Sequence, residues 1–345
     1  MATLKELSER TGYSAATISR ILNGDAALSV SDETRRKVLE EAGRINYTAT
    51  RSRRGRTPKR TLRVAVAEHL TPVQQLSNPY YLFLANYVRQ ECLDKKYTYL
   101  PMERRGSGFV VNDGEPVNGV VAIGVFSPSE IESLAALSPN IVFMDSSPFE
   151  SLYDSVVVGY ELGISLALEH LFNLRHRKIG FIGPSHNEGD RKQWVPEIRR
   201  QYFIKIMKTN GFLDTNLLLE CPMRQTDAKV AIERFLQTCE RRPTAFICAN
   251  EESAIGVSLA LREAGLSVPE DISIVSFDDT PKSTLVEPLL TSVSTHVEEM
   301  SKTALRLLAE RACVGGSAPV RKFPLKVIVP PSLVVRESTG EARTD

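Results

Sequence analysis

The chain has 345 residues, of which 42% are hydrophobic and 25% charged, and its formal net charge is +1. That length predicts two or three domains, and the composition is typical of a soluble globular protein. No run of eighteen apolar residues occurs and the first ten residues include charges, so we expect neither a membrane-spanning helix nor a signal peptide, and hence a cytoplasmic protein. The five cysteines lack CxxC spacing and the five histidines are dispersed, so we expect reduced thiols, no metal site and no cofactor.

Positive charge is concentrated at the amino-terminal end. Residues 1–63 carry 14 Lys and Arg against 7 Asp and Glu, whereas the remainder carries 29 against 35. Residues 51–63, RSRRGRTPKRTLR, contain seven basic residues and no acidic one. Such a segment buries too little apolar surface to fold alone and is attracted to a polyanion. A solvated linker is the alternative interpretation.

Residues 1–47 show the spacing of three short helices. The first ends at a tight turn at Gly12, the second begins at a Ser14 cap, and the third begins at a Ser31 cap. The predicted inward side chains are Leu4, Leu7 and Thr11 in the first helix, Ile18, Ile21 and Leu22 in the second, and Val38, Leu39, Ala42 and Ile45 in the third. Helix, glycine turn and second helix form a helix-turn-helix, and the third helix completes its small core.

From Leu62 onward, short apolar runs alternate with helical stretches such as LFLANYVRQECL and SAIGVSLALREAG. The alternation predicts an α/β body of doubly wound parallel sheets in two lobes, with a ligand between them at the carboxyl ends of the strands. We expect a basic hinge at 48–61, a first lobe at about 62–160 and 291–320, a second lobe at about 161–290 and 321–340, and frayed residues from about 338. The predicted strands are LRVAVA, NGVVAIG, IVFMD, SVVV, KIGFIG, TAFICA and ISIVSF.

The amino-terminal segment resembles the helix-turn-helix of the LacI/GalR family of bacterial transcriptional regulators; it reads MATLKELSERTGYSAATISRILNGDAALSVSDETRRKVLE. The body resembles that family's effector-binding core, itself similar to periplasmic sugar-binding proteins, in HLFNLRHRKIGFIGP, AFICANEESAIGVSLALREAGLSVPEDISIVSFDD and PLLTSVSTHVEEMSKTALRLL. The stretches NPYYLFL and YDSVVVGY, with His296, are most similar to its galactoside-responsive branch. The resemblance implies a DNA-binding repressor controlled by a small-molecule effector, a galactoside or another sugar.

The resemblance implies that the second helix enters the major groove of duplex DNA. Ala15 and Ala16 would meet thymine methyl groups, and Arg20 would donate to a guanine. The hydroxyl and amide side chains, with the basic arm, would hold phosphates. Alternatively, the alanines and serines are simply good helix and cap residues. The predicted DNA-contacting residues are Thr3, Ser14, Ala15, Ala16, Thr17, Ser19, Arg20, Asn23, Ser31, Arg51, Arg53, Arg54 and Arg56.

The hinge departs from the family pattern Tyr-x-Pro-Asn-x-x-Ala-Arg-x-Leu. The corresponding stretch is YTATRSRRGR, with Ala49 for proline, Thr50 for asparagine and Arg56 for the leucine that wedges between bases. A guanidinium suits a narrow minor groove better than it unstacks a base step. We therefore expect weaker kinking of the DNA, or a hinge that orders poorly.

Polar residues at strand ends predict the effector site. Asp145, Asn250 and Asp278 each end a predicted strand, and carboxylate and amide groups suit sugar hydroxyls, although helix capping or a turn is the alternative. The resemblance adds an arginine, with Arg199 preferred to Arg200. Aromatic side chains could stack on a sugar ring or simply fill the core. The predicted ligand-binding residues are Tyr80, Asp145, Trp194, Arg199, Asn250, Phe277 and Asp278.

Binding two half-sites of a near-palindromic operator requires a homodimer, and closure of the lobes around an effector would change DNA affinity by linkage. The carboxyl-terminal GEARTD lacks a leucine heptad, so a dimer is preferred to a tetramer. An enzyme on the same scaffold is the first alternative, but GFIGPSH lacks the glycine spacing of a nucleotide fingerprint. A sugar receptor for transport is the second, and the basic headpiece counts against it.

Overall fold

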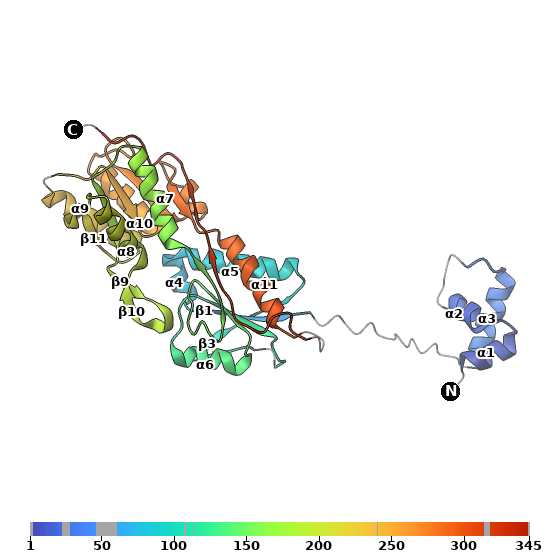
Figure 1. Cartoon of the computed structure of the whole chain (residues 1–345). Coiled ribbons are helices and arrows are strands. Elements are labelled where there is room, and N and C mark those ends of the chain that lie inside the picture. The colour runs from blue at the N-terminus through green and yellow to red at the C-terminus, as the bar shows by residue number, and fades with distance from the viewer. Residues whose placement is uncertain are drawn as a thin grey trace. The chain divides into compact units, whose positions relative to one another are not determined.

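The computed structural model describes residues 3–22, 28–45, 61–106, 108–112, 114–239, 241–313 and 318–343. The chain divides into two compact units, Met1–Lys59 and Arg60–Asp345 (Figure 1). The expected hinge at 48–61 lies outside the described residues except for Thr61. Within the described ranges, no helix combines the length and the apolar character needed to cross a membrane.

The first unit contains the three predicted helices, α1 (Leu4–Thr11), α2 (Ala15–Leu22) and α3 (Asp32–Arg44). Gly12 ends α1 in the left-handed conformation, with φ of 76°, and its amide donates to the Ser8 carbonyl at 3.0 Å. Glycine carries no Cβ penalty there, so the chain can turn directly into α2. The core joins side chains of all three helices, namely Leu7, Ile18, Ile21, Val38 and Ala42.

The buried face of α3 is narrower than the sequence predicted. Val38 and Ala42 are buried and Ile45 packs against them, but Leu39 is 50% exposed. Successive helical residues are about 100° apart, so Leu39 lies beside the buried stripe that Val38 begins. The prediction that Leu39 belongs to the core was therefore wrong.

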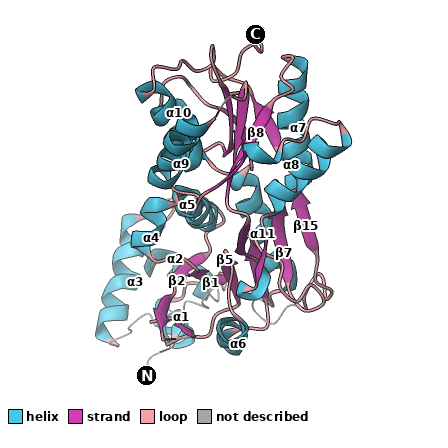
Figure 2. Ribbon diagram, turned by 90° about the vertical axis from the view of Figure 1, so that its left-hand side faces the viewer, coloured by secondary structure: helices cyan, strands magenta, loops and turns pink. Residues whose placement is uncertain are grey.

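The second unit is built from two lobes, each a layered α/β structure (Figure 2). The first lobe has a parallel sheet in the order β15-β7-β6-β5-β1-β2, with the hairpin β3–β4 beside it. Helices α5 and α11 pack on one face of this sheet and α6 on the other. The elements are β1 (Arg63–Glu68), α4 (Pro72–Ser77), α5 (Pro79–Asp94), β2 (Thr98–Pro101), β3 (Glu103–Arg105), β4 (Gly108–Val110), β5 (Gly119–Ile123), α6 (Pro128–Leu137), β6 (Ile141–Met144), β7 (Asp154–Val158), α11 (Val297–Arg311) and β15 (Lys326–Val329).

The second lobe has a sheet in the order β11-β8-β12-β13-β14-β16, which is parallel except for the β14–β16 pair. Helices α7 and α8 cover one face, and α9 and α10 cover the other. The elements are α7 (Tyr160–Asn173), β8 (Ile179–Gly183), β9 (His186–Glu188), η1 (Asp190–Lys192), β10 (Trp194–Pro196), α8 (Ile198–Thr209), η2 (Thr215–Leu217), β11 (Leu218–Glu220), α9 (Gln225–Thr238), β12 (Ala245–Cys248), α10 (Glu251–Glu263), β13 (Ser273–Asp278), η3 (Pro281–Thr284), β14 (Thr291–Ser294) and β16 (Ser332–Val334).

The seven strands predicted from apolar runs are confirmed as β1, β5, β6, β7, β8, β12 and β13. Every residue of β5, β6, β8, β12 and β13 is buried, because helices cover both faces of each sheet. Strands in this position are apolar throughout rather than alternating. The predicted doubly wound, two-lobed body is thus the observed one.

The partition of the carboxyl-terminal third differs from the expected one. Strand β14 lies in the second lobe rather than the first, and β15 lies in the first lobe rather than the second. The chain therefore passes between the lobes after β7, after β14 and after β15. The position of β14 between β13 and β16, and that of β15 beside β7, depends on contacts between distant parts of the chain. The short apolar runs alone therefore could not assign these two strands to a lobe.

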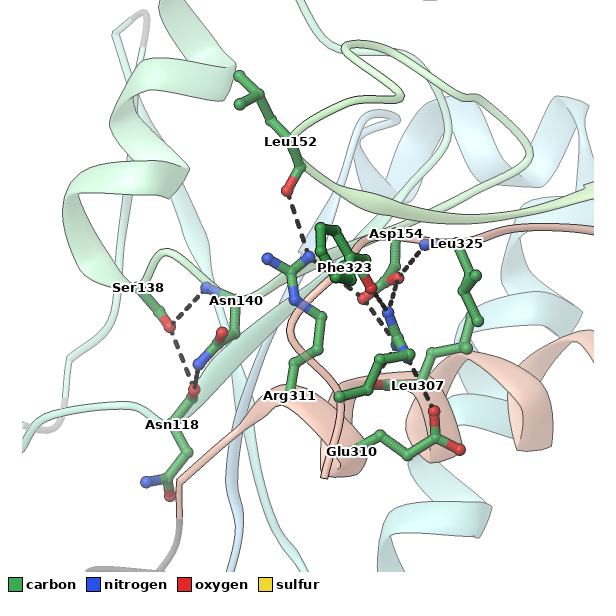
Figure 3. Close-up of polar contacts among 11 residues, drawn as sticks. Asn118, Ser138, Asn140, Leu152, Asp154, Leu307, Glu310, Arg311, Phe323 and Leu325 are labelled. Atoms are coloured by element: carbon green, nitrogen blue, oxygen red, sulfur yellow. Dashed lines mark hydrogen bonds and ion pairs between the residues drawn. The ribbon is translucent and has the colours of Figure 1, made fainter. Parts of the chain in front are cut away.

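A buried carboxylate fixes the start of β15 to the first lobe (Figure 3). Asp154, which is 1% exposed, accepts from the Arg321 guanidinium at 2.8 and 3.1 Å and from the Leu325 amide at 2.6 Å. Arg311, at the end of α11, lies 3.4 Å from the same carboxylate. Arg321 also pairs with Glu310 at 3.0 Å. The cluster ties β7, α11 and the segment before β15 together.

Residues 338–343 make hydrogen bonds to the second lobe, so the expectation that the chain frays from about 338 was wrong for these residues. Ser338 is fully buried, and its carbonyl accepts from the Ile274 amide at 2.7 Å. The His176 ring shares hydrogen bonds with the Thr244 hydroxyl and the Gly340 carbonyl, at 2.8 and 3.0 Å. Backbone groups within residues 338–343 thus find hydrogen-bond partners on the second lobe.

Candidate functional sites

One face of α2 is presented at the surface of the first unit. Ile18 and Ile21 point into the core, whereas Ser14, Ala15, Ala16 and Arg20 are exposed and Thr17 and Ser19 are partly exposed. The first turn of α2 therefore carries only small side chains on its outer face, and Arg20 follows on the next turn. Such a helix lets its backbone approach a partner closely, which insertion into a major groove requires.

Three hydroxyl side chains predicted to hold phosphates also cap helices. Thr3, Ser14 and Ser31 accept from backbone amides three residues later, at 3.2, 3.1 and 3.2 Å. These bonds satisfy amides that the first helical turn leaves unpaired. Thr17 and Ser19 are partly exposed on α2, and the remaining predicted phosphate contacts lie outside the described residues, namely Asn23, Arg51, Arg53, Arg54 and Arg56.

The second unit contains a cavity of about 630 Å³ whose wall comes from both lobes. Asp145 follows β6 of the first lobe, while Asn250 and Asp278 stand at the ends of β12 and β13 of the second. The carboxyl ends of parallel strands are where open α/β sheets bind ligands. The structure thus brings together five of the predicted residues, Tyr80, Asp145, Arg199, Asn250 and Asp278.

Asp145 is held by two tyrosines that the predicted site did not contain. The Tyr81 and Tyr160 hydroxyls donate to its carboxylate at 2.7 and 3.2 Å. Burial raises the pKa of Asp145, and the two hydroxyl donors oppose that rise. Tyr80 is buried beside Tyr81 and directs its hydroxyl to the Met300 sulfur at 3.9 Å. Tyr81 rather than Tyr80 therefore supplies a polar group next to the Asp145 carboxylate.

Arg199, and not Arg200, is the arginine of the cavity. Its guanidinium donates to Glu197 at 2.6 Å, to the Ala249 carbonyl at 2.5 Å and to the Met223 sulfur at 3.2 Å. Burial opposes ionisation of Glu197, but the adjacent Arg199 charge holds the pKa of Glu197 below its usual value. Arg200 instead donates to backbone carbonyls of β8 and β11, such as Gly183 at 3.0 Å and Leu218 at 3.1 Å. The cavity arginine is therefore already paired within the protein.

Asn250 and Asp278 line the cavity from the second lobe. The Asn250 carbonyl oxygen caps α10 by accepting from the Ser253 amide at 3.0 Å, and its amide donates to the Met223 carbonyl at 3.2 Å. Asp278 has φ of 93° at the end of β13, a strained conformation for a residue with a Cβ. Burial raises its pKa to about 7, and Arg199 opposes that rise.

Trp194 and Phe277 do not line the cavity. Trp194 is 71% exposed on β10 and stacks on His186, with ring centroids 6.2 Å apart. Phe277 is fully buried in the core between the second sheet and helices α7 and α8. Alternation along each strand explains both positions, because Val195 and Asp278 point into the cavity instead.

Sequence reasoning also missed the hairpin β9–β10, which contributes Asn187, Glu188, Asp190, Arg191 and Gln193 to the cavity wall. The hairpin strands are exposed or half-exposed and show no apolar alternation, so no pattern marked them. The ion pair between Glu197 and Arg199 could have been suspected from the sequence, because an acidic and a basic residue lie only two positions apart. Tyr160 had a weak signal in its position at the start of α7, two residues after the end of β7.

Known proteins resemble the chain over nearly its whole length. Residues 168–339 match the periplasmic binding protein-like domain family. The HTH-type transcriptional repressor MelR of Bacillus subtilis is 31% identical over 99% of this chain and 98% of its own length. The HTH-type transcriptional regulator GanR of the same species is 30% identical over 98% and 99%. The chain belongs to the LacI/GalR family of transcriptional regulators.

Solved structures agree with the fold of this LacI/GalR-family regulator. A complex of the transcriptional regulator CelR with cellobiose has a TM-score of 0.65 at 21% identity and covers 98% of this chain and 100% of that one. A Lac repressor dimer bound to operator and the anti-inducer ONPF has a TM-score of 0.62 at 23% identity, over 98% and 99%. The curated relatives are transcriptional regulators rather than enzymes.

Proposed function

We propose that this regulator is a repressor that binds double-stranded operator DNA through α2 and whose operator affinity is controlled by a neutral sugar in the cavity. The outer face of α2 carries the first half of the proposal. It combines exposed Ala15 and Ala16 with Arg20 one turn later, on a helix whose other face is fixed by Ile18 and Ile21. We propose neither of the two alternative functions, an enzyme or a sugar receptor for transport.

In the proposed complex, the Ala15 and Ala16 methyl groups meet thymine methyls, and Arg20 donates to a guanine edge in the major groove. Thr3, Ser14, Thr17, Ser19, Asn23 and Ser31 hold phosphates, together with the arginines of residues 51–56. A homodimer in the cytoplasm places two headpieces on a near-palindromic operator. The Lac repressor structure, a dimer on its operator, supports this arrangement.

The charges of the cavity support a neutral effector. Arg199 is paired with Glu197, and Lys326, which also lines the wall, lies 2.7 Å from Glu150. Arg191 also lines the wall, but the carboxylates Asp145, Glu188 and Asp190, together with Asp278 when it is ionised, outnumber it and would repel an anionic ligand. Carboxylates, tyrosine hydroxyls and an amide provide the acceptors and donors that sugar hydroxyls need. A galactoside or another neutral sugar fits these groups, and CelR with cellobiose is a related complex.

A DNA-binding experiment tests the first half. Fluorescence anisotropy with duplexes from the regulator's own promoter region should show specific binding that weakens steeply with salt. Arg20→Ala should weaken specific binding about 10- to 100-fold, which corresponds to about 1–3 kcal/mol. Arg36→Ala is the matched control, because Arg36 is exposed on α3 and lies 3.8 Å from Glu40. Equal loss in the two variants, or no binding to any such duplex at low salt, contradicts the proposal.

A ligand screen tests the second half. Lactose, melibiose, cellobiose, galactose and ribose should include a sugar that raises the melting temperature, because a ligand of the folded state stabilises it by mass action. Galacturonate is the charged counterpart and should give no rise. A rise with galacturonate, and none with the neutral sugars, contradicts the assignment of a neutral effector.

A further inference from the structure

The hairpin of residues 186–196 stands apart from both large sheets. Strands β9 and β10 pair only with one another in the described structure, with Asn187 opposite Val195, and η1 forms the tip. In Figure 1 this hairpin projects from the second lobe toward the first. We name residues 186–196 the strap.

The tip of the strap has a conformation that needs external support. Arg191 and Lys192 have φ of 61° and 54°, in the left-handed region that residues with a Cβ seldom adopt. Each such residue costs about 1–2 kcal/mol in conformational free energy, which surrounding contacts must offset. Two consecutive residues of this kind indicate that the tip is shaped by what it touches.

The tip touches the first lobe through three side chains in succession. The Ser147 amide donates to the Asp190 carboxylate at 2.7 Å. The Arg191 guanidinium lies 5.4 Å from the centre of the Phe149 ring. The Lys192 ammonium lies 3.1 Å from Glu130 on α6. A hydrogen bond to a charged group, a cation–π contact and an ion pair thus cross between the lobes at one place.

The receiving groups on the first lobe are held in place by their own partners. Glu130 is 3% exposed; it accepts from the Ser127 amide at 2.7 Å in a capping box and also binds Arg104. The Ser147 hydroxyl lies 2.7 Å from Ser155. The docking point is therefore rigid and preorganised, whereas the strap is joined to its own lobe through two short strands.

The strap also forms one wall of the cavity. Asp190, Arg191 and Gln193 line it, while Lys192 and Trp194 do not. The same tip therefore both fastens the lobes and covers the ligand space. A permanent wall would be expected to pack an apolar face on a sheet, but all three residues of β10 are exposed.

We propose that the strap is a fastener between the lobes that opens as a unit to admit and release the effector. Asp190 and Lys192 hold it closed, and Arg191 and Gln193 contact the bound molecule. The fastening itself follows from the contacts of the tip with the first lobe, whereas its role in ligand entry rests on the proposed function. A separate experiment tests each part.

Hydrogen exchange in the ligand-free, full-length protein tests the fastening. Lys192→Glu places a carboxylate against Glu130 and does not touch the Ser147 amide, so faster exchange at Ser147 reports opening of the whole tip. We expect an increase of about 10-fold. Lys208→Glu, on an exposed position of α8, is the matched control with the same charge change and should leave the rate within about 2-fold. Unchanged exchange at Ser147 in Lys192→Glu overturns the proposal.

Trp194 gives an independent reading, because it is the single tryptophan of the chain and lies in the strap. Lys192→Glu and Asp190→Ala should both change its emission and its quenching by acrylamide, with unchanged far-ultraviolet circular dichroism. Identical emission and quenching in both variants and in Lys208→Glu would mean that the strap is static, which overturns the proposal.

Stopped-flow fluorescence with lactose and cellobiose tests ligand entry. In Lys192→Glu, the rates of sugar entry and exit should both rise, by about the factor seen in exchange. Faster exchange with unchanged sugar kinetics overturns the gating role. If neither sugar binds the unmodified protein, the gating role for these sugars and their place in the proposed function both fail, while the exchange result still decides the fastening.

Discussion

Replacing Asp278 by asparagine tests whether the cavity contains a carboxyl group that is half-protonated near neutral pH. Asp278 is buried at the end of β13, and burial raises its pKa from 3.8 to about 7. A carboxyl whose pKa is raised on folding binds more protons in the folded state than in the unfolded state. Its contribution to stability is therefore complete below about pH 4 and is lost as the pH rises through about 7.

The size of the effect follows from the two pKa values. Between about pH 5.5 and pH 8.5, the free energy of unfolding should fall by about 2 kcal/mol through this group alone, since each pKa unit is worth about 1.4 kcal/mol and about half of the shift is titrated in that range. For a body of this size the change corresponds to about 4 °C in melting temperature. The side chain of the Asp278→Asn variant cannot ionise, so the variant should lack this loss.

Calorimetry of both proteins across this pH range measures the difference. Burial also lowers the pKa of His69 to about 4 and lowers those of His170 and His176, and these groups raise stability as the pH increases. Their contributions are common to both proteins and cancel in the comparison. The melting temperature of Asp278→Asn should therefore gain about 4 °C on the unmodified protein between about pH 5.5 and pH 8.5. Parallel pH curves would refute the reasoning, because they would mean that Asp278 is ionised throughout.

Four further substitutions test three separate predictions. Asp154→Asn should lower the free energy of unfolding by about 3 kcal/mol, because it leaves two arginines beside a neutral side chain, and an unchanged melting temperature would contradict this. Glu197→Gln should free the Arg199 charge and allow galacturonate to bind, which isothermal calorimetry measures; continued exclusion of galacturonate would count against the pairing argument. Val38→Ala should destabilise the first unit by about 2 kcal/mol and Leu39→Ala by less than about 0.5, as chemical denaturation would show; equal effects would contradict the narrow buried face.

The strands of the two sheets were predictable where helices cover both faces, because such strands are apolar throughout. Strand β15 also contains an apolar run, yet it was not predicted as a strand and its residues were assigned to the wrong lobe. Its place beside β7 is fixed by Asp154, which binds the Leu325 amide from far away in the sequence. Contacts of that separation leave no local pattern. The same holds for the exposed strands β9 and β10, which neither periodicity nor composition marks.

The cavity residues likewise divide into those that the sequence could predict and those whose positions depend on distant contacts. Asp145, Asn250 and Asp278 could be predicted to lie together because the strand ends of parallel sheets converge, which is a property of the fold class. Arg199 came from the resemblance to the family. The direction of Trp194 depended on a hairpin that the sequence did not reveal, and the burial of Phe277 depended on the packing of α7. The direction of the Trp194 and Phe277 side chains within their strands was therefore predicted less well than the convergence of the strand ends.

The charges around the cavity are arranged so that closure does not depend on a charged ligand. Arg199 is neutralised by Glu197, Asp145 accepts from two tyrosines, and Lys192 pairs across the lobes with Glu130. An effector that binds two conformations equally shifts neither of them. Because the groups that remain for the ligand come from both lobes, a neutral sugar can contact all of them only when the lobes are together. Its preference for that arrangement, rather than its total affinity, sets how far it can change the affinity of the headpiece for DNA.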